Sequence, residues 1–204
     1  MIPKNKIKCF LILWILVSWN LNAQWIMEKS NTSDNLNSIF LYGENSAWIV
    51  GDNGTMLYRN AFKWMEYPKV TANNLYSVLL LDENQGWAVG SKGTILYFNG
   101  SRWENFPSPT AETLFSVSFL DPENGFAVGT NGVILEYIKD SWKVMEQYTR
   151  GKLFTVVCKD DISIIGGGLE NMSIPLRIYN FNFNKNTISS FDPDYIAIKS
   201  LAIA

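Results

Sequence analysis

Short apolar runs alternate with brief polar breaks along most of the chain, and the second of these units shows the pattern clearly. Residues 75–81 form a β-prone apolar run, residues 86–90 form the next, and a break at Ser91 and Lys92 follows. Residues 93–98 and 103–106 complete the unit, separated by the turn signal Asn99-Gly100. This pattern predicts four short antiparallel strands per unit, and no stretch shows helical periodicity of useful length.

The unit repeats with a period of 39 residues. Leucines mark the period at Leu36, Leu75, Leu114 and Leu153, and a Ser or Thr follows two residues after each leucine. The same spacing relates Trp48, Trp87 and Phe126; Val50, Val89 and Val128; Gly51, Gly90 and Gly129; Gly54, Gly93 and Gly132; and Trp25, Trp64, Trp103 and Trp142. Four antiparallel strands in a repeat of about 40 residues are typical of a β-propeller blade.

The sequence therefore predicts an all-β propeller of four-stranded antiparallel blades, with repeats that begin near residues 36, 75, 114 and 153 and a partial repeat near residue 198. The fourth repeat is less regular, because Gly166-Gly167-Gly168 predict an irregular hairpin and Phe181 stands where a Trp is expected. Isolated strands near Trp25 and Leu201 cannot complete a fifth blade. We expect an incomplete propeller of about four blades plus terminal strands, cut from a longer ring in which the Trp25 strand pairs with a late C-terminal blade.

Two repeated features have a physical explanation at this level. The Gly-x-x-Gly element, as in Gly90 and Gly93, is expected to reverse the chain in two residues, where at least one φ is positive and glycine carries no steric penalty. The repeated Trp and Leu positions are expected to be the faces by which neighbouring blades bury each other. A carbohydrate-stacking role of the tryptophans is the less favoured interpretation.

The first 23 residues have the pattern of a secretory signal peptide. Lys4, Lys6 and Lys8 precede an apolar run over residues 9–19, and Ala23 ends a short polar stretch. The apolar run is about half of the ~20 residues that a membrane-spanning helix needs, so an uncleaved anchor is the less favoured alternative. We predict cleavage near Ala23, a propeller domain over residues 24–204, a secreted or periplasmic location, and no stable membrane span in the mature chain.

Removal of this segment changes the charge balance. Three of the 17 Lys and Arg residues leave with it while all 19 Asp and Glu residues remain, so the net charge becomes −5. Such a surface disfavours nucleic acid as a partner. Cys9 also leaves, so Cys158 is the sole remaining cysteine and no intrachain disulfide is expected.

The chemistry needed for catalysis is sparse. A sialidase requires convergent arginines, and the four in the mature chain occupy non-equivalent positions: Arg59, Arg102, Arg150 and Arg177. Because the chain has no His, a calcium ion bound by Asp52 and Asn53 is the metal site that we consider. The alternative is that these two residues form an ordinary Asx turn. Cys158 aligns with core positions and has no histidine to activate it. We predict no enzyme activity, no cofactor and no metal.

Several segments resemble a known group of repeats. Gly86-Trp87-Ala88-Val89-Gly90, Gly93-Thr94-Ile95-Leu96-Tyr97 and Asn99-Gly100-x-x-Trp103 are similar to the photosystem II stability and assembly factor type of propeller, within the neuraminidase-repeat (BNR-like) group. The first two segments recur at residues 125–129 and 132–137. The resemblance is good over about residues 36–145 and weak over 146–204. It implies the propeller fold and protein binding without catalysis.

Propellers commonly bind through loops at one end of the ring, where side chains vary on a fixed scaffold. The candidate ligand-face residues are Asp52, Asn53, Lys69, Asn73, Asn74, Ser91, Lys92, Ser108, Glu112, Thr130, Asn131, Arg150 and Lys152. The first hypothesis is a non-catalytic protein-binding or assembly module whose partner is a protein or complex of the cell envelope. The alternatives are a glycan-binding or glycan-hydrolysing (sialidase-like) propeller and a purely structural part of a larger surface protein.

Overall fold

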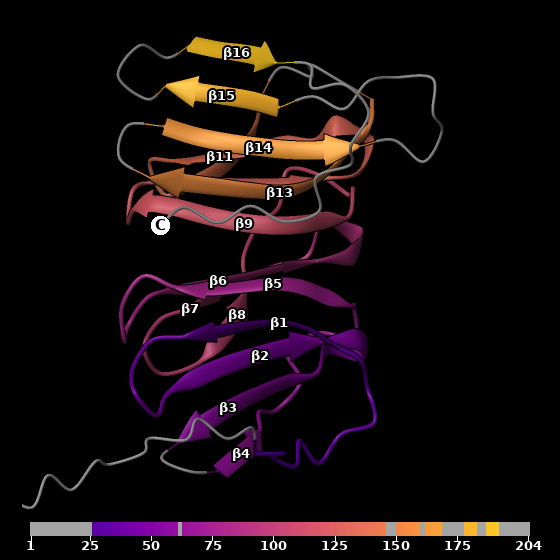
Figure 1. Ribbon diagram of the computed structural model, residues 1–204, viewed down its shortest axis with the longest axis vertical. Helices are drawn as coiled ribbons and strands as arrows, with labels where there is room; N and C mark the ends of the chain where they lie inside the picture. The colour runs from indigo at the N-terminus through magenta and orange to yellow at the C-terminus, as the bar shows by residue number, and fades with distance from the viewer. Residues whose placement is uncertain are drawn as a thin grey trace, which may run out of the picture.

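Four antiparallel sheets of four strands each make up the fold. The computed structural model describes residues 26–60, 63–145, 150–159, 162–168, 178–182 and 187–191. The sheets follow one another along the chain and are stacked along the long axis of the molecule, with the first at one end and the fourth at the other (Figure 1). The protein is an all-β propeller with about four blades, as the 39-residue period predicts.

The strands of each blade run in chain order from the inner strand outward. The first blade contains β1 (Leu36–Leu41), β2 (Ala47–Gly51), β3 (Met56–Asn60) and β4 (Lys63–Glu66). The second contains β5 (Leu75–Leu80), β6 (Gly86–Gly90), β7 (Ile95–Phe98) and β8 (Trp103–Asn105). The third contains β9 (Leu114–Asp121), β10 (Asn124–Gly129), β11 (Ile134–Ile138) and β12 (Ser141–Val144). The fourth contains β13 (Lys152–Lys159), β14 (Ile162–Gly168), β15 (Ile178–Asn182) and β16 (Thr187–Phe191).

The inner strands β1, β5, β9 and β13 contact one another in sequence. The serine that follows each repeated leucine links these strands, because its hydroxyl oxygen accepts a backbone N–H from the inner strand of the next blade. The bonds run from Val78 to Ser38 (3.4 Å), from Val117 to Ser77 (3.3 Å) and from Val156 to Ser116 (3.2 Å). An exposed strand edge thereby gains partners for its N–H groups.

Each blade meets the preceding blade through one face, here called its leading face, and the following blade through the other, its trailing face. The trailing-face residues are equivalent in the first three blades: Trp48, Val50 and Met56; Trp87, Val89 and Ile95; and Phe126, Val128 and Ile134. They pack against leading-face residues such as Leu75, Val78 and Leu80 of the second blade. The blade interfaces therefore form the hydrophobic core.

The tryptophans occupy these interfaces. The rings of Trp48 and Trp103 lie 5.5 Å apart, centroid to centroid, across the first interface, and those of Trp87 and Trp142 lie 5.5 Å apart across the second. The predicted inter-blade role is confirmed for these four residues. Trp25 lies outside the described residues.

Only the second glycine of the Gly-x-x-Gly element has the positive φ that the sequence predicts for this turn. Gly93 does have a positive φ of 68°, and Lys92 before it also has a positive φ, of 55°. Gly90, however, is extended. A Cβ at Gly90 would lie 2.0 Å from the backbone oxygen of Asn74, which accepts the N–H of Ser91 (2.8 Å). The first glycine is therefore required by close approach of two backbone segments rather than by its own φ.

The fourth blade departs from the period in its second strand. Phe119 pairs with Gly125, six residues later, whereas the equivalent Cys158 pairs with Ser163, five residues later. A one-residue slip exchanges the two faces of a strand. Gly167, rather than Gly168, consequently takes the place of Gly129, with a Cβ position 2.5 Å from the backbone oxygen of Lys152.

Two predictions for this blade are therefore wrong. Gly166, Gly167 and Gly168 are the end of β14 and pair with β13; they do not form a hairpin turn. Phe181 lies on the third strand, β15, instead of on the fourth. The reason is a longer connection: nine residues separate β14 from β15, whereas four separate β10 from β11.

The remaining predictions about the ends of the chain lie outside the described residues. They concern the signal peptide over residues 1–23, the Trp25 strand and the partial repeat near residue 198. Within the described ranges, no helix is long and apolar enough to cross a membrane.

Candidate functional site

One end of the stacked blades carries all of the candidate ligand-face residues. The strands are antiparallel, so the start of each inner strand, the end of each second strand and the connection to the next blade meet at the same end. We call this the linker end. It contains the turns Asp52–Gly54, Ser91–Gly93 and Thr130–Gly132 and the connections between blades. The sequence prediction that these residues share one end is consistent with this arrangement.

Many of these side chains bind the blade itself. In the third blade the carboxylate of Glu112 accepts hydrogen bonds from the Thr130 hydroxyl and from the side-chain amide of Asn131 (2.8 Å for the latter). The two bonds, led by that of Thr130, lower the pKa of Glu112 below its ordinary value. The backbone N–H of Thr113 also donates to the Thr130 hydroxyl oxygen (3.0 Å). The linker is thereby fastened to the turn.

In the first and second blades, other residues form the equivalent hydrogen bonds between linker and turn, which we call the clasp. Asp34, which the sequence reasoning did not single out, accepts from the hydroxyl of Thr55 and the amide of Asn53. These bonds, with Thr55 first, lower the pKa of Asp34. In the second blade the Asn73 amide donates to the hydroxyl oxygen of Thr94 (2.9 Å). Asp34, Asn73 and Glu112 are 39 residues apart, so the position could have been found from the period.

The carboxylate weighed for calcium also has partners. Asp52 accepts hydrogen bonds from the side-chain amides of Asn35 (2.8 Å) and Asn37 (3.0 Å). Asn53 donates its backbone N–H to the side-chain oxygen of Asn74 (2.9 Å). In the part of the chain that the structure describes, no three His, Cys, Asp or Glu side chains converge to hold a metal ion.

Cations at the linker end reach the solvent. Lys69 and Lys92 are exposed, and so is Arg150 at the start of the fourth blade, while Lys152 is half-buried. The Lys69 ammonium lies 3.8 Å from a carboxylate oxygen of Asp34, a distance typical of a weak surface pair. Asp34, Asp52 and Glu112 are held by amide and hydroxyl donors, whereas Lys69, Lys92 and Arg150 are exposed.

A row of aromatic rings lies near the start of the inner strands, and the sequence reasoning did not identify it. Tyr76, Phe115 and Phe154 lie on three successive inner strands and are half-buried. Their ring centroids are separated by 5.5 Å and 5.4 Å. We call Tyr76, Phe115 and Phe154 the aromatic row.

A repeated β-bulge positions the aromatic row. In the second blade Leu75 pairs with Gly90 and Ser77 pairs with Val89, which leaves Tyr76 unpaired in the ladder. The same shift occurs around Phe115 and Phe154. A bulge redirects the side chain of its extra residue. The signal in the sequence is the residue between each repeated Leu and Ser or Thr, which is aromatic in three of four repeats.

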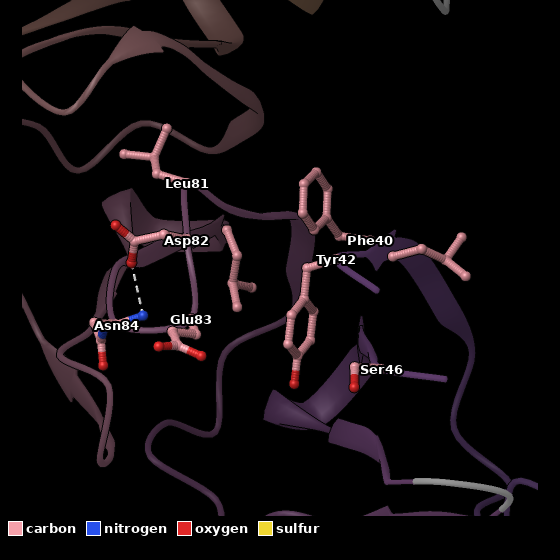
Figure 2. Close-up of a pocket in the computed structure, with 9 residues that line it drawn as sticks. Phe40, Tyr42, Ser46, Leu81, Asp82, Glu83 and Asn84 are labelled. Atoms are coloured by element: carbon pink, nitrogen blue, oxygen red, sulfur yellow. Dashed lines mark hydrogen bonds between the residues drawn. The ribbon is translucent and has the colours of Figure 1, made fainter. Parts of the chain in front are cut away.

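A separate hollow lies at the opposite end of the first two blades (Figure 2). It has a volume of about 780 Å³, and its apolar wall includes Phe40, Tyr42 and Leu81. The hairpin residues after β5 form the other side, where the Asp82 carboxylate accepts the backbone N–H of Asn84 (2.7 Å). This hollow does not belong to the linker end, and none of the candidate ligand-face residues lines it.

The described residues weighed for catalysis do not converge; Arg177 lies outside the described residues. Arg59 on β3 pairs with Glu28 (2.8 Å), and Arg102 before β8 pairs with Glu104 (3.3 Å), so both are engaged at the outer strands. Cys158 accepts a hydrogen bond from the Ser163 hydroxyl (3.0 Å), and burial raises the pKa of its thiol. A raised pKa disfavours the thiolate that a nucleophile needs.

The blades thus form a β-propeller whose linker end carries the aromatic row and the exposed cations. No protein-family model and no curated protein sequence matches the chain. It is similar to the structure of YCF48 bound to a D1 peptide, with a TM-score of 0.62 and 15% identity over 81% of this chain and 55% of that one. It is also similar to YCF48 from Cyanidioschyzon merolae, with a TM-score of 0.63 and 16% identity over 85% and 61% of the two chains.

A designed protein has the same architecture at a shorter length. The computationally designed Ika4 protein matches with a TM-score of 0.58 and 10% identity, over 83% of this chain and 98% of that one. The chain thus spans somewhat more than half of the YCF48 chains and nearly all of the designed one. These likenesses establish the propeller fold.

Proposed function

We propose that this protein is a non-catalytic propeller that binds a protein partner through the linker end of its inner strands. The observation that carries the proposal is the aromatic row. Each ring lies within contact distance of the ring on the next inner strand, and all three remain partly accessible. Solvent-accessible aromatic side chains on a rigid scaffold are the anchors that dominate many protein interfaces.

The shape of the aromatic row favours an extended segment of a partner. The rings form a line that crosses from the second blade to the fourth, since each belongs to the next inner strand. An extended chain that lies along this line places successive side chains against successive rings. A propeller of the same fold, YCF48, has been solved with a D1 peptide bound, which supports peptide recognition as a use of this architecture.

The surrounding charges favour a partner segment that carries carboxylates. Lys69, Lys92 and Arg150 are exposed at the linker end, whereas Asp34 and Glu112 have their oxygens bonded to neighbouring hydroxyl and amide groups. Complementary charge at the edge of an interface contributes mainly to specificity and association rate. The aromatic row then supplies most of the affinity.

We further propose that this binding occurs outside the cytoplasm, in the periplasm or at the cell surface. The support is the signal-peptide pattern of Lys4, Lys6 and Lys8 followed by the apolar run over residues 9–19. The partner is then a protein or protein complex of the cell envelope.

The test is a pull-down from an envelope extract with mass spectrometry of retained proteins, and a glycan array on the same preparation. The variant that combines Tyr76→Ala with Phe115→Ala is expected to lose at least about tenfold of the retained partner, because each ring supplies interface area. Val144→Ala, on the outer strand β12, is the matched control because Val144 is also an accessible apolar residue. Circular dichroism establishes that both variants are folded.

Each outcome has a distinct meaning. Reproducible protein partners that the double variant loses, with a silent array, support the proposal. Strong glycan signal that is lost with Arg150→Ala and Lys152→Ala overturns it in favour of a carbohydrate-directed propeller. Partners that bind the double variant as well as the wild type overturn the assignment of the aromatic row.

A further inference from the structure

The leading face of the first blade is apolar and open. Leu36, Ile39 and Leu41 of β1 are 41%, 53% and 63% exposed. Of the nine residues at equivalent positions in later blades, eight are at most 8% exposed, namely Leu75, Val78 and Leu80; Leu114, Val117 and Phe119; and Leu153 and Val156. The ninth, Cys158, is half-buried. The residue types are similar, so the difference comes from packing: among the described residues, no blade lies against the leading face of the first blade.

The interface that would cover this face is already present three times in the molecule. In each case a trailing face with the pattern of Trp87, Val89 and Ile95 packs on a leading face of this kind. In the second blade, the backbone N–H of Val78 donates to the Ser38 hydroxyl of the preceding blade. Among the described residues, the equivalent N–H of Ile39 in the first blade has no such serine. The face therefore fits the trailing face of another blade of the same repeat.

The open area is limited to the inner half of the face. Farther out, Glu28 accepts hydrogen bonds from Arg59 (2.8 Å) and from the indole N–H of Trp64 (2.6 Å). Arg59 occupies the position of Phe98 in the second blade and of Tyr137 in the third. The chain thus covers the outer half with its own N-terminal segment and leaves the half around Ile39 open.

The fourth blade has Ile164 at the first trailing-face position and Gly166 where Val89 and Val128 stand in the second and third blades. Ile164 pairs with Val157, as Trp87 pairs with Leu79 and Phe126 pairs with Ser118. Trp87 and Phe126 are fully buried by the blade that follows each of them, whereas Ile164 is half-buried. Figure 1 places the first and fourth blades at opposite ends of the molecule, so the fourth blade of the same chain does not cover the first.

We propose that the leading face of the first blade docks on the trailing face of the fourth blade in a second copy of this chain. The contact is head-to-tail, and it occurs twice when two copies close on each other, which gives a ring with a two-fold axis. It continues the interface that already joins the blades within the chain.

The test is the oligomeric state, measured by sedimentation velocity over a range of concentrations. The wild type is expected to be a dimer. Ile39→Asp and Ile164→Asp, on the two halves of the contact, are each expected to raise the dissociation constant at least about tenfold, because each places a charge in an apolar interface. Val144→Asp is the matched control: Val144 is 53% exposed, as Ile39 is, but lies on the outer strand β12.

A mixture of the Ile39→Asp and Ile164→Asp chains distinguishes this arrangement from others. In a head-to-tail dimer the mixture retains one unmodified contact, so dimer is expected to return in part, which misfolded chains would not show. A monomeric wild type overturns the proposal. So does an unchanged dimer in Ile164→Asp, which would indicate contact between two first blades, and so does an open-ended polymer.

Discussion

The interface between the second and third blades and the interface between the third and fourth use the same backbone with different side chains. Trp87 in the second blade lies within 5.5 Å, centroid to centroid, of Phe119, Tyr137 and Trp142 in the third. The equivalent Phe126 belongs to a cluster filled mainly by aliphatic residues, with Leu153, Val156 and Ile165 from the fourth blade. The first of these two interfaces is aromatic and the second is aliphatic.

The difference shows which parts of the repeat the backbone requires. The leucine that opens each inner strand, the hydroxyl two residues later and the glycine that meets a neighbouring carbonyl occur in both interfaces. The large trailing-face residue changes from Trp87 to Phe126, and the second strand of the fourth blade, β14, is shifted by one residue relative to the period. Contacts between backbone segments thus tolerate less variation than the contents of the core.

The largest expected effect concerns the aromatic interface. Trp87→Ala should destabilise the protein by about 4 kcal/mol, since it removes a fully buried ring that touches rings of two blades. Phe126→Ala should cost less, about 3 kcal/mol, because the ring is smaller. Chemical denaturation measures both.

Trp87→Phe is the matched control for this pair. It introduces the residue that the third blade has at the same position, and it removes an indole N–H that is buried with no hydrogen-bond partner among the described residues. We expect a loss of about 1 kcal/mol. If Phe126→Ala proves the more costly of the two alanine variants, the aromatic interface is not the stronger one.

The next effect concerns the glycines at the end of the second strands. Gly90→Ala should cost about 3 kcal/mol, because its Cβ would lie 2.0 Å from the Asn74 backbone oxygen and neither backbone segment can move freely. Gly167→Ala in the fourth blade should cost less, since the corresponding distance is 2.5 Å. Thermal unfolding of both variants checks the order.

Gly43→Ala serves as the control for these glycines. Gly43 lies in the exposed hairpin of the first blade, and its Cβ would meet only the side chain of Ser46 at 3.7 Å or more. Its unfolding midpoint should be close to that of the wild type. Equal losses for all three variants would contradict the close-approach explanation.

A smaller effect is expected from the serines between inner strands. Ser77→Ala and Ser116→Ala should each cost about 1 kcal/mol, because the N–H of Val117 or Val156 loses its acceptor. The two values should be similar, since this contact is shared by both interfaces. Hydrogen exchange of the two amides provides a local measurement, and unchanged protection would contradict the role of the hydroxyls.

The smallest effect depends on pH. The bonds from Thr130 and Asn131 lower the pKa of Glu112, so this clasp contributes stability above the ordinary carboxyl pKa of 4.5 and loses it as the pH falls through the lowered value in the folded protein. The fourth repeat has Gly151 at this position. Hydrogen exchange should show that acid loosens the linker at Glu112 and not the equivalent segment at Gly151, and that Glu112→Gln, which lacks the titrating carboxyl, removes the pH dependence.

Much of the fold could be predicted because the repeat is carried by local requirements. Leu75, Ser77 and Gly90 satisfy needs within one strand pair or between adjacent inner strands, so they recur at a fixed spacing. The slip in the fourth blade could not be predicted, since Leu153 and Thr155 keep the period on β13 while the hairpin that follows is one residue shorter. The position of Phe181 shifted for a related reason, a longer connection before β15.

The candidate site was predictable in place but not in content. The 39-residue period indicated which loops share one end, yet it did not show that Glu112, Asn73 and Asn131 fasten the linkers to the turns. The aromatic row was missed because Tyr76, Phe115 and Phe154 read as ordinary strand residues between a leucine and a hydroxyl residue. Only the bulge, a feature of pairing between strands, separates them from the ladder.

The sequence by itself determined the period, the strands of the regular blades and the residues that face neighbouring blades. The tertiary structure alone decided whether such a face is buried. Leu36 and Leu75 occupy the same place in the repeat, yet one is 41% exposed and the other is fully buried. Pattern follows from the strand that carries a residue, whereas burial depends on what packs against it, and a repeat cannot encode the presence of its neighbour.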